Sequence, residues 1–479
     1  LITTAGVAGL IKVLEGMRHG ELAPTLHADT PIPGLAGSPF RLLQERQAWL
    51  SDGPRSAGVS AFGFGGNNAH LIVQEHSKTT PASAMPTTRH IAHDEVVVVG
   101  VGAIVGDGRD KADFLSRIDR KDSNYTGLAA DVVLPLTGLR FPPRDLEQAL
   151  PQQLLAFGAA CEALADVNDL PKQTTGVLMG MGCDPEVARY GARWRTVAWA
   201  AELGVFDPNW VASARDAFVP ALGAAGVLGT MPNIPANRLN SQFDLGGPSM
   251  AVSSEELSGV RALQQAVRQL QHGELDAAVV GAVDMSCEPV HIKAAGALGN
   301  RHQAGDAAVV MVLKRRKDAE KAGDTIYASV DGQVESGSAG GAASGASGGI
   351  DPAQLQASFG RAHAAWGLLN VAANVLSLAG KGSKEKVTVT VEALGGQSAS
   401  VAVIGNGQAV SIAATPTPSG ATLRVAAHPP IVRLPALPAP AVVGASRDTT
   451  APAAQQMSPA PALPRVTAPD ELIETPVAA

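Results

Sequence analysis

The residues with the clearest potential for chemistry lie where a turn, a short strand and a helix follow one another in the middle of the chain. Gly247-Pro248 predicts the turn, residues 250–252 the strand, and apolar residues at helical spacing over residues 257–270 the helix. Ser253 and Glu256 form an S-x-x-E pair at the helix start, the pattern of a capping box. On composition alone, we therefore predict that Glu256 caps this helix.

Cysteine chemistry is not indicated by the sequence. Cys161, Cys183 and Cys287 form no pairable framework and have no metal-ligand spacing. We interpret them as small buried hydrophobic residues of a protein from a reducing compartment.

A nucleotide site is weakly suggested near residue 100. A valine-rich strand at residues 96–99 precedes Gly100, Gly102 and Gly106, which is close to a dinucleotide-binding fingerprint. The third glycine comes one residue late, and only Asp119 lies near the position of a ribose-binding acid. We therefore interpret this segment as a first core strand followed by a glycine turn.

The composition is that of a compact protein with a large core. Of the 479 residues, 45% are hydrophobic and 17% charged, and the formal net charge is -7. No basic stripe is present, so we expect no nucleic-acid partner. The longest apolar run, residues 96–105, is shorter than the ~20 residues that span a bilayer. We expect a soluble, cytoplasmic chain without membrane contact, forming part of a longer polypeptide.

An internal repeat organises the chain. Residues 1–17 and 362–378 both predict a helix with one buried face, and residues 59–73 and 389–403 both predict strand, Gly-Gly turn and strand. The matching helix positions are Gly6 with Gly367, Leu10 with Val371, Leu14 with Val375 and Met17 with Leu378. The order of elements in one unit is thus found twice.

The repeat predicts four segments. Residues 1–76 form the end of a first unit, residues 77–94 a linker, and residues 95–414 a nearly complete second unit. Residues 415–479 are dominated by Pro and Ala, which predicts a disordered linker. A Gly/Ser/Ala-rich stretch at residues 335–349 predicts a loop inside the second unit.

The second unit resembles the beta-ketoacyl synthase family of condensing enzymes. In that family a Gly-Pro-Ser turn and a short strand lead to the nucleophilic Cys of an Asp-Thr-Ala-Cys motif, and aligning on Gly247-Pro248-Ser249 places Glu256 at the nucleophile position. The family's first catalytic His falls in the stretch 335–349 and its second at Arg361. In this register His363 is a helix-side residue, which we do not expect to act in catalysis.

The first unit resembles the same family at its C-terminal signatures, Ser38-Pro39-Phe40-Arg41 and residues 63–70. The resemblance implies that Phe64 gates the nucleophile and that Gly65 and Gly66 let the backbone approach the acyl thioester. Asn67 stands where the family has Thr. These four residues are the substrate-binding residues that we predict. The second catalytic His would directly precede Leu1.

The resemblance implies a thiolase-like, layered α-β-α-β-α fold, with one partial and one nearly complete unit. It implies a ketosynthase–chain length factor pair of a multidomain fatty acid or polyketide synthase, supporting decarboxylative Claisen condensation of malonyl and acyl thioesters. The partners would be an acyl carrier protein and the ketosynthase unit of the same polypeptide. No directly bound cofactor is expected, because the carrier's phosphopantetheine arm delivers the substrate. Two alternatives are a malonyl decarboxylase of the loading type, acting through Glu256, and a purely structural scaffold.

Overall fold

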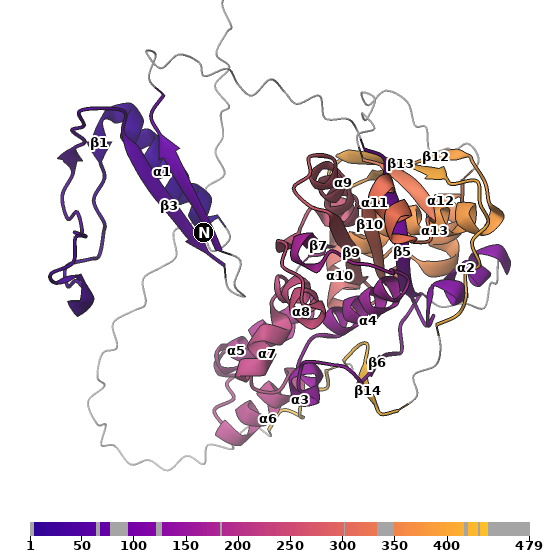
Figure 1. Cartoon of the computed structure of the whole chain (residues 1–479). Coiled ribbons are helices and arrows are strands. Elements are labelled where there is room, and N and C mark those ends of the chain that lie inside the picture. The colour runs from indigo at the N-terminus through magenta and orange to yellow at the C-terminus, as the bar shows by residue number, and fades with distance from the viewer. Residues whose placement is uncertain are drawn as a thin grey trace, which may run out of the picture. The chain divides into compact units, whose positions relative to one another are not determined.

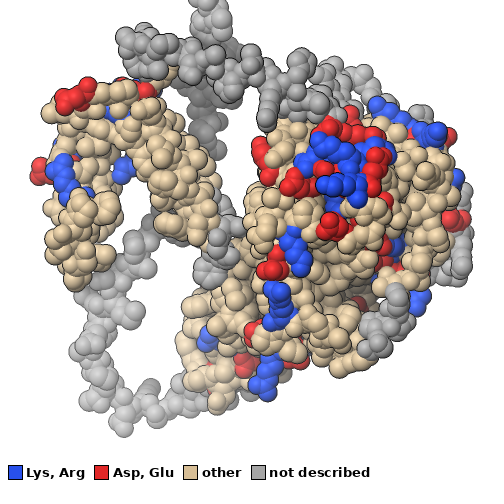
Figure 2. Space-filling view, in the orientation of Figure 1, with Lys and Arg blue, Asp and Glu red and all other residues tan. Residues whose placement is uncertain are grey.

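The computed structural model describes residues 4–63, 68–76, 94–120, 127–182, 184–300, 302–332, 349–415, 420–429 and 432–438. Figure 1 shows the N-terminal elements and the larger α/β body that begins at residue 94. Figure 2 shows basic and acidic side chains intermixed on the face that it draws. No helix in the described part of the chain combines the length and hydropathy needed to cross a membrane.

The N-terminal elements are a helix and a hairpin, as the repeat predicts. Helix α1 (Ala5–His19) ends at Gly20, whose left-handed backbone closes the last turn. Strands β3 (Ser56–Phe62) and β4 (Asn68–Gln74) pair antiparallel, and Gly6 of α1 lies against Ala61 of β3. The shorter elements are β1 (Glu21–Leu22), the 3-10 turn Pro33–Leu35 and β2 (Gln47–Ala48). The predicted substrate-binding residues Phe64, Gly65, Gly66 and Asn67, and the predicted linker up to residue 93, lie outside the described residues.

An eight-stranded sheet forms the centre of the larger body, in the order β12-β13-β11-β5-β10-β9-β7-β8. Strands β7, β8 and β9 are parallel to one another, and the remaining neighbours are antiparallel. The strands are β5 (Val96–Val105), β7 (Thr175–Gly180), β8 (Ser249–Val252), β9 (Ala277–Met285), β10 (Asp306–Arg315), β11 (Ala328–Asp331), β12 (Lys386–Glu392) and β13 (Ser398–Gly405).

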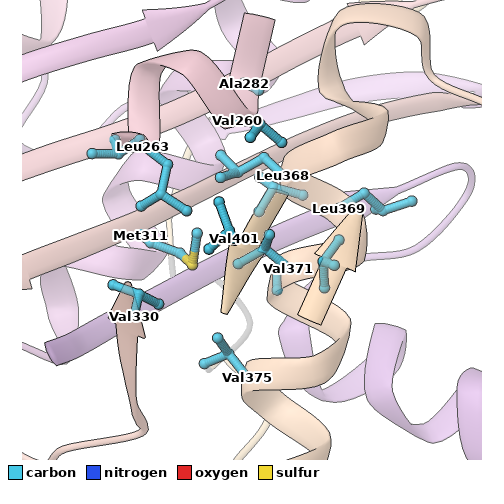
Figure 3. Packing of buried hydrophobic residues seen from close by; sticks show 14 of the residues in the cluster. Val260, Leu263, Ala282, Met311, Val330, Leu368, Leu369, Val371, Val375 and Val401 are labelled. Atoms are coloured by element: carbon cyan, nitrogen blue, oxygen red, sulfur yellow. The ribbon is translucent and has the colours of Figure 1, made fainter. Parts of the chain in front are cut away.

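Both faces of the sheet centre are buried, which explains why β5 and residues 307–313 of β10 are apolar without alternation. Val96 and Val98 belong to one hydrophobic cluster and Val97 and Val99 to another, because successive side chains point to opposite faces. Helices α4 (Pro151–Ala165) and α8 (Ile234–Phe243) cover the second cluster's face. Helices α9 (Ser258–Gln271) and α13 (Trp366–Lys381) cover the first, where Val260 and Leu263 meet Leu368 (Figure 3).

The thiolase-like layered α/β fold is confirmed. Helix α13 contacts β10 on one side and β12 and β13 on the other, and α9 contacts both β9 and β13. The sheet therefore supplies two β layers, with α9 and α13 between them and α4 and α8 outside. The remaining helices are α2 (Lys111–Arg120), α3 (Pro143–Glu147), α5 (Val187–Glu202), α6 (Pro208–Phe218), α7 (Ala224–Thr230), α10 (Pro289–Ala297), α11 (Arg316–Ala322) and α12 (Pro352–Phe359).

The interpretation of Gly100 and Gly102 as a turn is wrong. Both lie inside β5, and only Gly106, with φ of 57°, forms the turn. A methyl group on Gly100 or Gly102 would overlap the carbonyl oxygens of Ala163 and Ala159 in α4. The glycines at these two positions allow α4 to approach the strand closely.

The predicted end of the second unit at residue 414 is also wrong. Strand β14 (Thr422–Ala426) pairs antiparallel with β6 (Asp131–Pro135), and Leu423 is buried in the core. The short alternation of Thr-Leu-Arg-Val-Ala forms a strand because β6 offers an edge to pair with. The predicted disordered linker from residue 415 therefore contains a folded segment. Residues 416–419, 430–431 and 439–479 lie outside the described part.

A buried ion pair between Asp306 and His428 connects this C-terminal segment to the core. The Asp306 carboxyl accepts hydrogen bonds from the backbone N–H groups of Ala129 and Cys287, each at 2.9 Å, and pairs with His428. Burial alone would lower the pKa of His428, but the hydrogen bond to Asp306 and the charges of Asp306, Glu288 and Asp184 raise it above its ordinary value.

Candidate functional site

The turn that carries Glu256 lies between β8 and α9. A 3-10 turn (Glu255–Leu257) joins the two elements, and Glu255 has a left-handed backbone with φ of 49°. Such a conformation is unfavourable for a residue with a side chain and is found preferentially at functional sites. Gly180 of β7 lies against the backbone of Gly259, so the start of α9 packs directly on the sheet. The turn is thereby held rigidly.

The predicted capping box is not formed. Helix α9 begins at Ser258, after the 3-10 turn, and Glu256 makes no cap hydrogen bond. Ser258 closes the turn instead: its hydroxyl accepts the N–H of Ser254 at 2.9 Å and donates to the carbonyl of Glu255 at 2.6 Å. The Glu256 side chain therefore takes no part in closing this turn.

Glu256 instead lines a cavity of about 310 Å³. The cavity walls come from the turn before α9, from α10, from the segment before β10 and from the segment before α13. The lining residues are Glu256, His291, Ile292, Ala295, Gly296, Asn300, His302, Gln303, Ala304, Arg361 and His363. This volume is at the lower end of the range of small-molecule sites.

His363 was expected on the side of a helix, and the structure places it in the cavity beside Glu256. Its Nδ1 lies 3.8 Å from Glu256 Oε1, and its Nε2 lies 3.0 Å from Glu255 Oε2. The Ser286 hydroxyl accepts its backbone N–H at 3.0 Å, and the His291 ring meets it edge-on at 5.4 Å. The cause is a 3-10 turn (His363–Ala365) that precedes α13 and turns His363 inward.

Arg361, at the predicted second-histidine position, also lines the cavity. Its guanidinium lies over the Trp366 ring at 5.3 Å, a cation–π contact. Burial lowers the pKa of Arg361 below its ordinary value, and the charge of Glu256 opposes that effect. Its guanidinium still carries a positive charge at neutral pH.

Sequence reasoning missed His302 and His291. Burial and the charge of Arg361 lower the pKa of His302, so its imidazole is neutral at neutral pH and can donate one hydrogen bond. No sequence motif marks either residue. His291 lies in α10 and His302 in the segment before β10, and the fold brings both into the cavity that Glu256 lines. The Gly/Ser/Ala-rich stretch at residues 335–349 was predicted to replace the family's first histidine. Residues 335–348 of this stretch lie outside the described residues.

The described cysteines are poorly suited to act as nucleophiles. Burial raises the pKa of Cys161 to about 11, and burial with the charge of Asp306 raises the pKa of Cys287 strongly. Neither residue lines the cavity. Cys183 lies outside the described residues. Within the described ranges, no group of three or more His, Cys, Asp or Glu side chains is arranged to hold a metal ion.

Comparisons with known proteins agree with this architecture. The family model "Beta-ketoacyl synthase, N-terminal domain" matches residues 137–319. A polyunsaturated fatty acid synthase polypeptide of Thraustochytrium sp. is 28% identical over 394 residues, which are 70% of this chain and 18% of that protein. Polyketide synthase GfsA of Streptomyces halstedii is 47% identical over 222 residues, which are 44% of this chain and 3% of that protein. This chain thus spans less than a fifth of either relative.

Among solved structures, "PfaC Keto synthase-Chain length factor" superimposes with a TM-score of 0.68 at 19% identity, covering 88% of this chain and 54% of that one. At this identity the similarity shows the fold. The layered α/β fold of the larger body is the fold of this ketosynthase structure. The family match over residues 137–319 and the relatives named as synthases relate this part of the chain to the beta-ketoacyl synthases.

Proposed function

We propose that residues 94–435 act as a chain length factor, a ketosynthase-like unit that shapes the acyl tunnel of a partner ketosynthase without condensing substrates itself. Residues 1–76 would be the end of that ketosynthase in the same polypeptide. The proposal rests on Glu256, a carboxyl group on the rigid β8–α9 turn at the position that the sequence resemblance assigns to the family's thiol.

A carboxyl group in this position cannot support condensation. The family reaction needs a thiolate that forms a thioester and passes the acyl group on, and a glutamate offers no comparable carrier. The described cysteines lie elsewhere with raised pKa values. The reacting malonyl and acyl thioesters on an acyl carrier protein would therefore be processed in the partner unit, with the phosphopantetheine arm as the carrier and no further cofactor.

The surface of the larger body supports pairing with a second unit. Strand β8 lies at the edge of the sheet, where a further strand could pair with it. On and after α5, large apolar side chains are exposed, with Trp194 at 80% and Phe206 at 79%. In a chain with 4% aromatic residues, such exposure indicates an interaction surface. The relatives named as polyunsaturated fatty acid and polyketide synthases support a multidomain assembly, which we place in the cytoplasm.

The test uses a polypeptide that carries a complete first unit followed by this one. Glu256→Gln should leave the rate of condensation within about twofold, because Glu256 takes no part in it. Trp194→Asp should instead weaken pairing and change the chain length of the product. Loss of all condensation in a folded Glu256→Gln protein would contradict the proposal and favour a direct role in decarboxylation.

A further inference from the structure

The segment that follows β14 lies on helix α6. The indole Nε1–H of Trp210 donates a hydrogen bond to the backbone carbonyl of Pro435 at 3.3 Å. Residues 432–438 form neither helix nor strand, so no sheet edge holds this segment. Trp210 therefore recognises a peptide group of the segment through the only hydrogen-bond donor of its side chain.

The sequence of this segment favours the polyproline II conformation. Pro435 and Pro438 are locked near the φ of that conformation, and the residues before them, Leu434 and Leu437, are disfavoured in the helical region. Val432 and Pro435 are both half-buried, whereas the two residues between them are exposed. Because polyproline II has three residues per turn, this burial has its period, and one edge of the segment faces the protein.

The receiving surface is a helical pair with an apolar cluster of its own. Helices α5 and α6 pack against each other, and Figure 1 shows the pair to one side of the central sheet. Packing within the cluster fixes the Trp210 ring, so the direction of the indole N–H is set before a segment binds, which lowers the entropy cost of binding. The buried residues of the cluster are Ala200, Val205, Trp210 and Ala214.

Aromatic surfaces are the general means by which proteins recognise polyproline II segments, which expose their carbonyl groups and lose little entropy on binding. The contact with Trp210 requires only a backbone carbonyl and a proline-rich edge, and neither has to belong to the same chain. We propose that the Trp210 surface of α5 and α6 is a receptor for proline-rich segments. Residues 432–435 fill it in cis, and the proline-rich linker of a second polypeptide fills it in trans. This role does not depend on the chain-length-factor role.

Cis and trans segments must compete, because Trp210 has a single side-chain donor. The cis segment follows β14, which ends at Ala426, and so short a tether gives it an effective concentration on the order of millimolar. A trans segment therefore binds where it is locally concentrated, as in an assembly of several polypeptides, or where the cis segment has been loosened.

The probe is a fluorescein-labelled peptide with the sequence of residues 430–440, added to the 479-residue chain and followed by fluorescence anisotropy. We expect saturable binding that Pro435→Gly in the protein tightens about tenfold, because glycine releases the cis segment from the polyproline II conformation. Trp210→Phe, added to the Pro435→Gly protein, should weaken binding about fivefold through the loss of one hydrogen bond. Trp199→Phe is the matched control. Its ring meets Phe218 of the same helical pair at 6.2 Å, and the change should leave the affinity unaltered.

Three results would overturn the proposal. One is the absence of saturable binding to the Pro435→Gly protein, and another is equal binding of a peptide in which Pro435 and Pro438 are replaced by alanine. The third is equal affinity with and without Trp210→Phe. Should Trp210→Phe fail to fold, a peptide carrying Val432→Asp tests the same surface without altering the protein, and it should bind at least tenfold more weakly. Condensation does not enter this assay, so its outcome is independent of the chain-length-factor test.

Discussion

His428 Nε2 lies 2.6 Å from Asp306 Oδ2, joining the C-terminal segment to the beginning of β10 across 122 residues of sequence. The Asp306 side chain is fully buried and that of His428 is 14% exposed. Removing the imidazole would leave a buried carboxyl group short of one partner, which typically costs about 3 kcal/mol. We therefore expect His428→Ala to lower the free energy of unfolding by about that amount at pH 6.

The effect of His428→Ala should depend on pH. Because the folded-state pKa of His428 is raised above 6.5, its stabilisation is complete below that pH and is lost as pH rises through the raised value. Denaturant unfolding at pH 6 and pH 9 measures the change. His272→Ala is the control, because its contact with Glu274 is exposed and 3.8 Å long, and it should change stability by less than about 0.5 kcal/mol. If the unfolding free energies of the unsubstituted protein and His428→Ala differ as much at pH 9 as at pH 6, His428 is not ionised in the folded state.

Glu162 should give the protein a second pH dependence. Its carboxyl group accepts the N–H of Ala103 at 3.0 Å and of Lys111 at 2.9 Å, and the hydroxyl of Thr415 at 3.0 Å. Burial raises its pKa from 4.5 to about 7. Between these values the folded state holds a proton that the unfolded state has lost, so stability falls as pH rises, by roughly 3 kcal/mol in total.

Glu162→Gln should remove this slope, because an amide does not titrate. Unfolding free energies of both proteins from pH 4 to pH 8 would show the variant gaining on the unsubstituted protein as pH rises. Parallel curves for the two proteins would show that Glu162 does not hold a proton in the folded state.

Gly102→Ala should be strongly destabilising. The added methyl group would overlap the carbonyl oxygen of Ala159, and neither β5 nor α4 can move without disturbing the core. We expect a loss of about 3 kcal/mol or more in thermal or denaturant unfolding. The matched control is Gly191→Ala in α5, where nothing lies within 4 Å and helix propensity predicts a gain of up to about 1 kcal/mol. Equal effects of the two changes would refute the close approach of helix and strand.

Glu256→Cys alone should not restore condensation. A thiol on the β8–α9 turn would still lack the family's second histidine, since the sequence resemblance assigns Arg361 to that position. Loss of one oxyanion donor typically costs about 3 kcal/mol in the transition state. The assay is condensation of an acyl thioester with carrier-bound malonyl by the 479-residue chain. Product formation would show that the second unit needs only its nucleophile.

The repeated elements could be predicted from sequence because their signals are local. Helix α13 has apolar residues at helical spacing, and the β12–β13 hairpin has a Gly-Gly turn. Both signals lie within a short stretch of sequence. The cavity could not be predicted in the same way. His302 and His363 lie far apart in the sequence, and a 3-10 turn rather than a motif directs His363 inward. The capping-box prediction for Glu256 was wrong because a 3-10 turn precedes α9, so the helix begins at Ser258 and not after Ser253.

The pairing of β14 with β6 determines where the polypeptide can be cut without disrupting the larger body. Trp210 Nε1 donates a hydrogen bond to the carbonyl of Pro435 at 3.3 Å, so ordered contacts continue beyond β14. An exchange of this unit between related synthases with a junction at residue 414 would expose the β6 edge and leave Asp306 without His428. A junction placed after Pro435 transfers the unit with its closing strand, and recombination at that point preserves the fold.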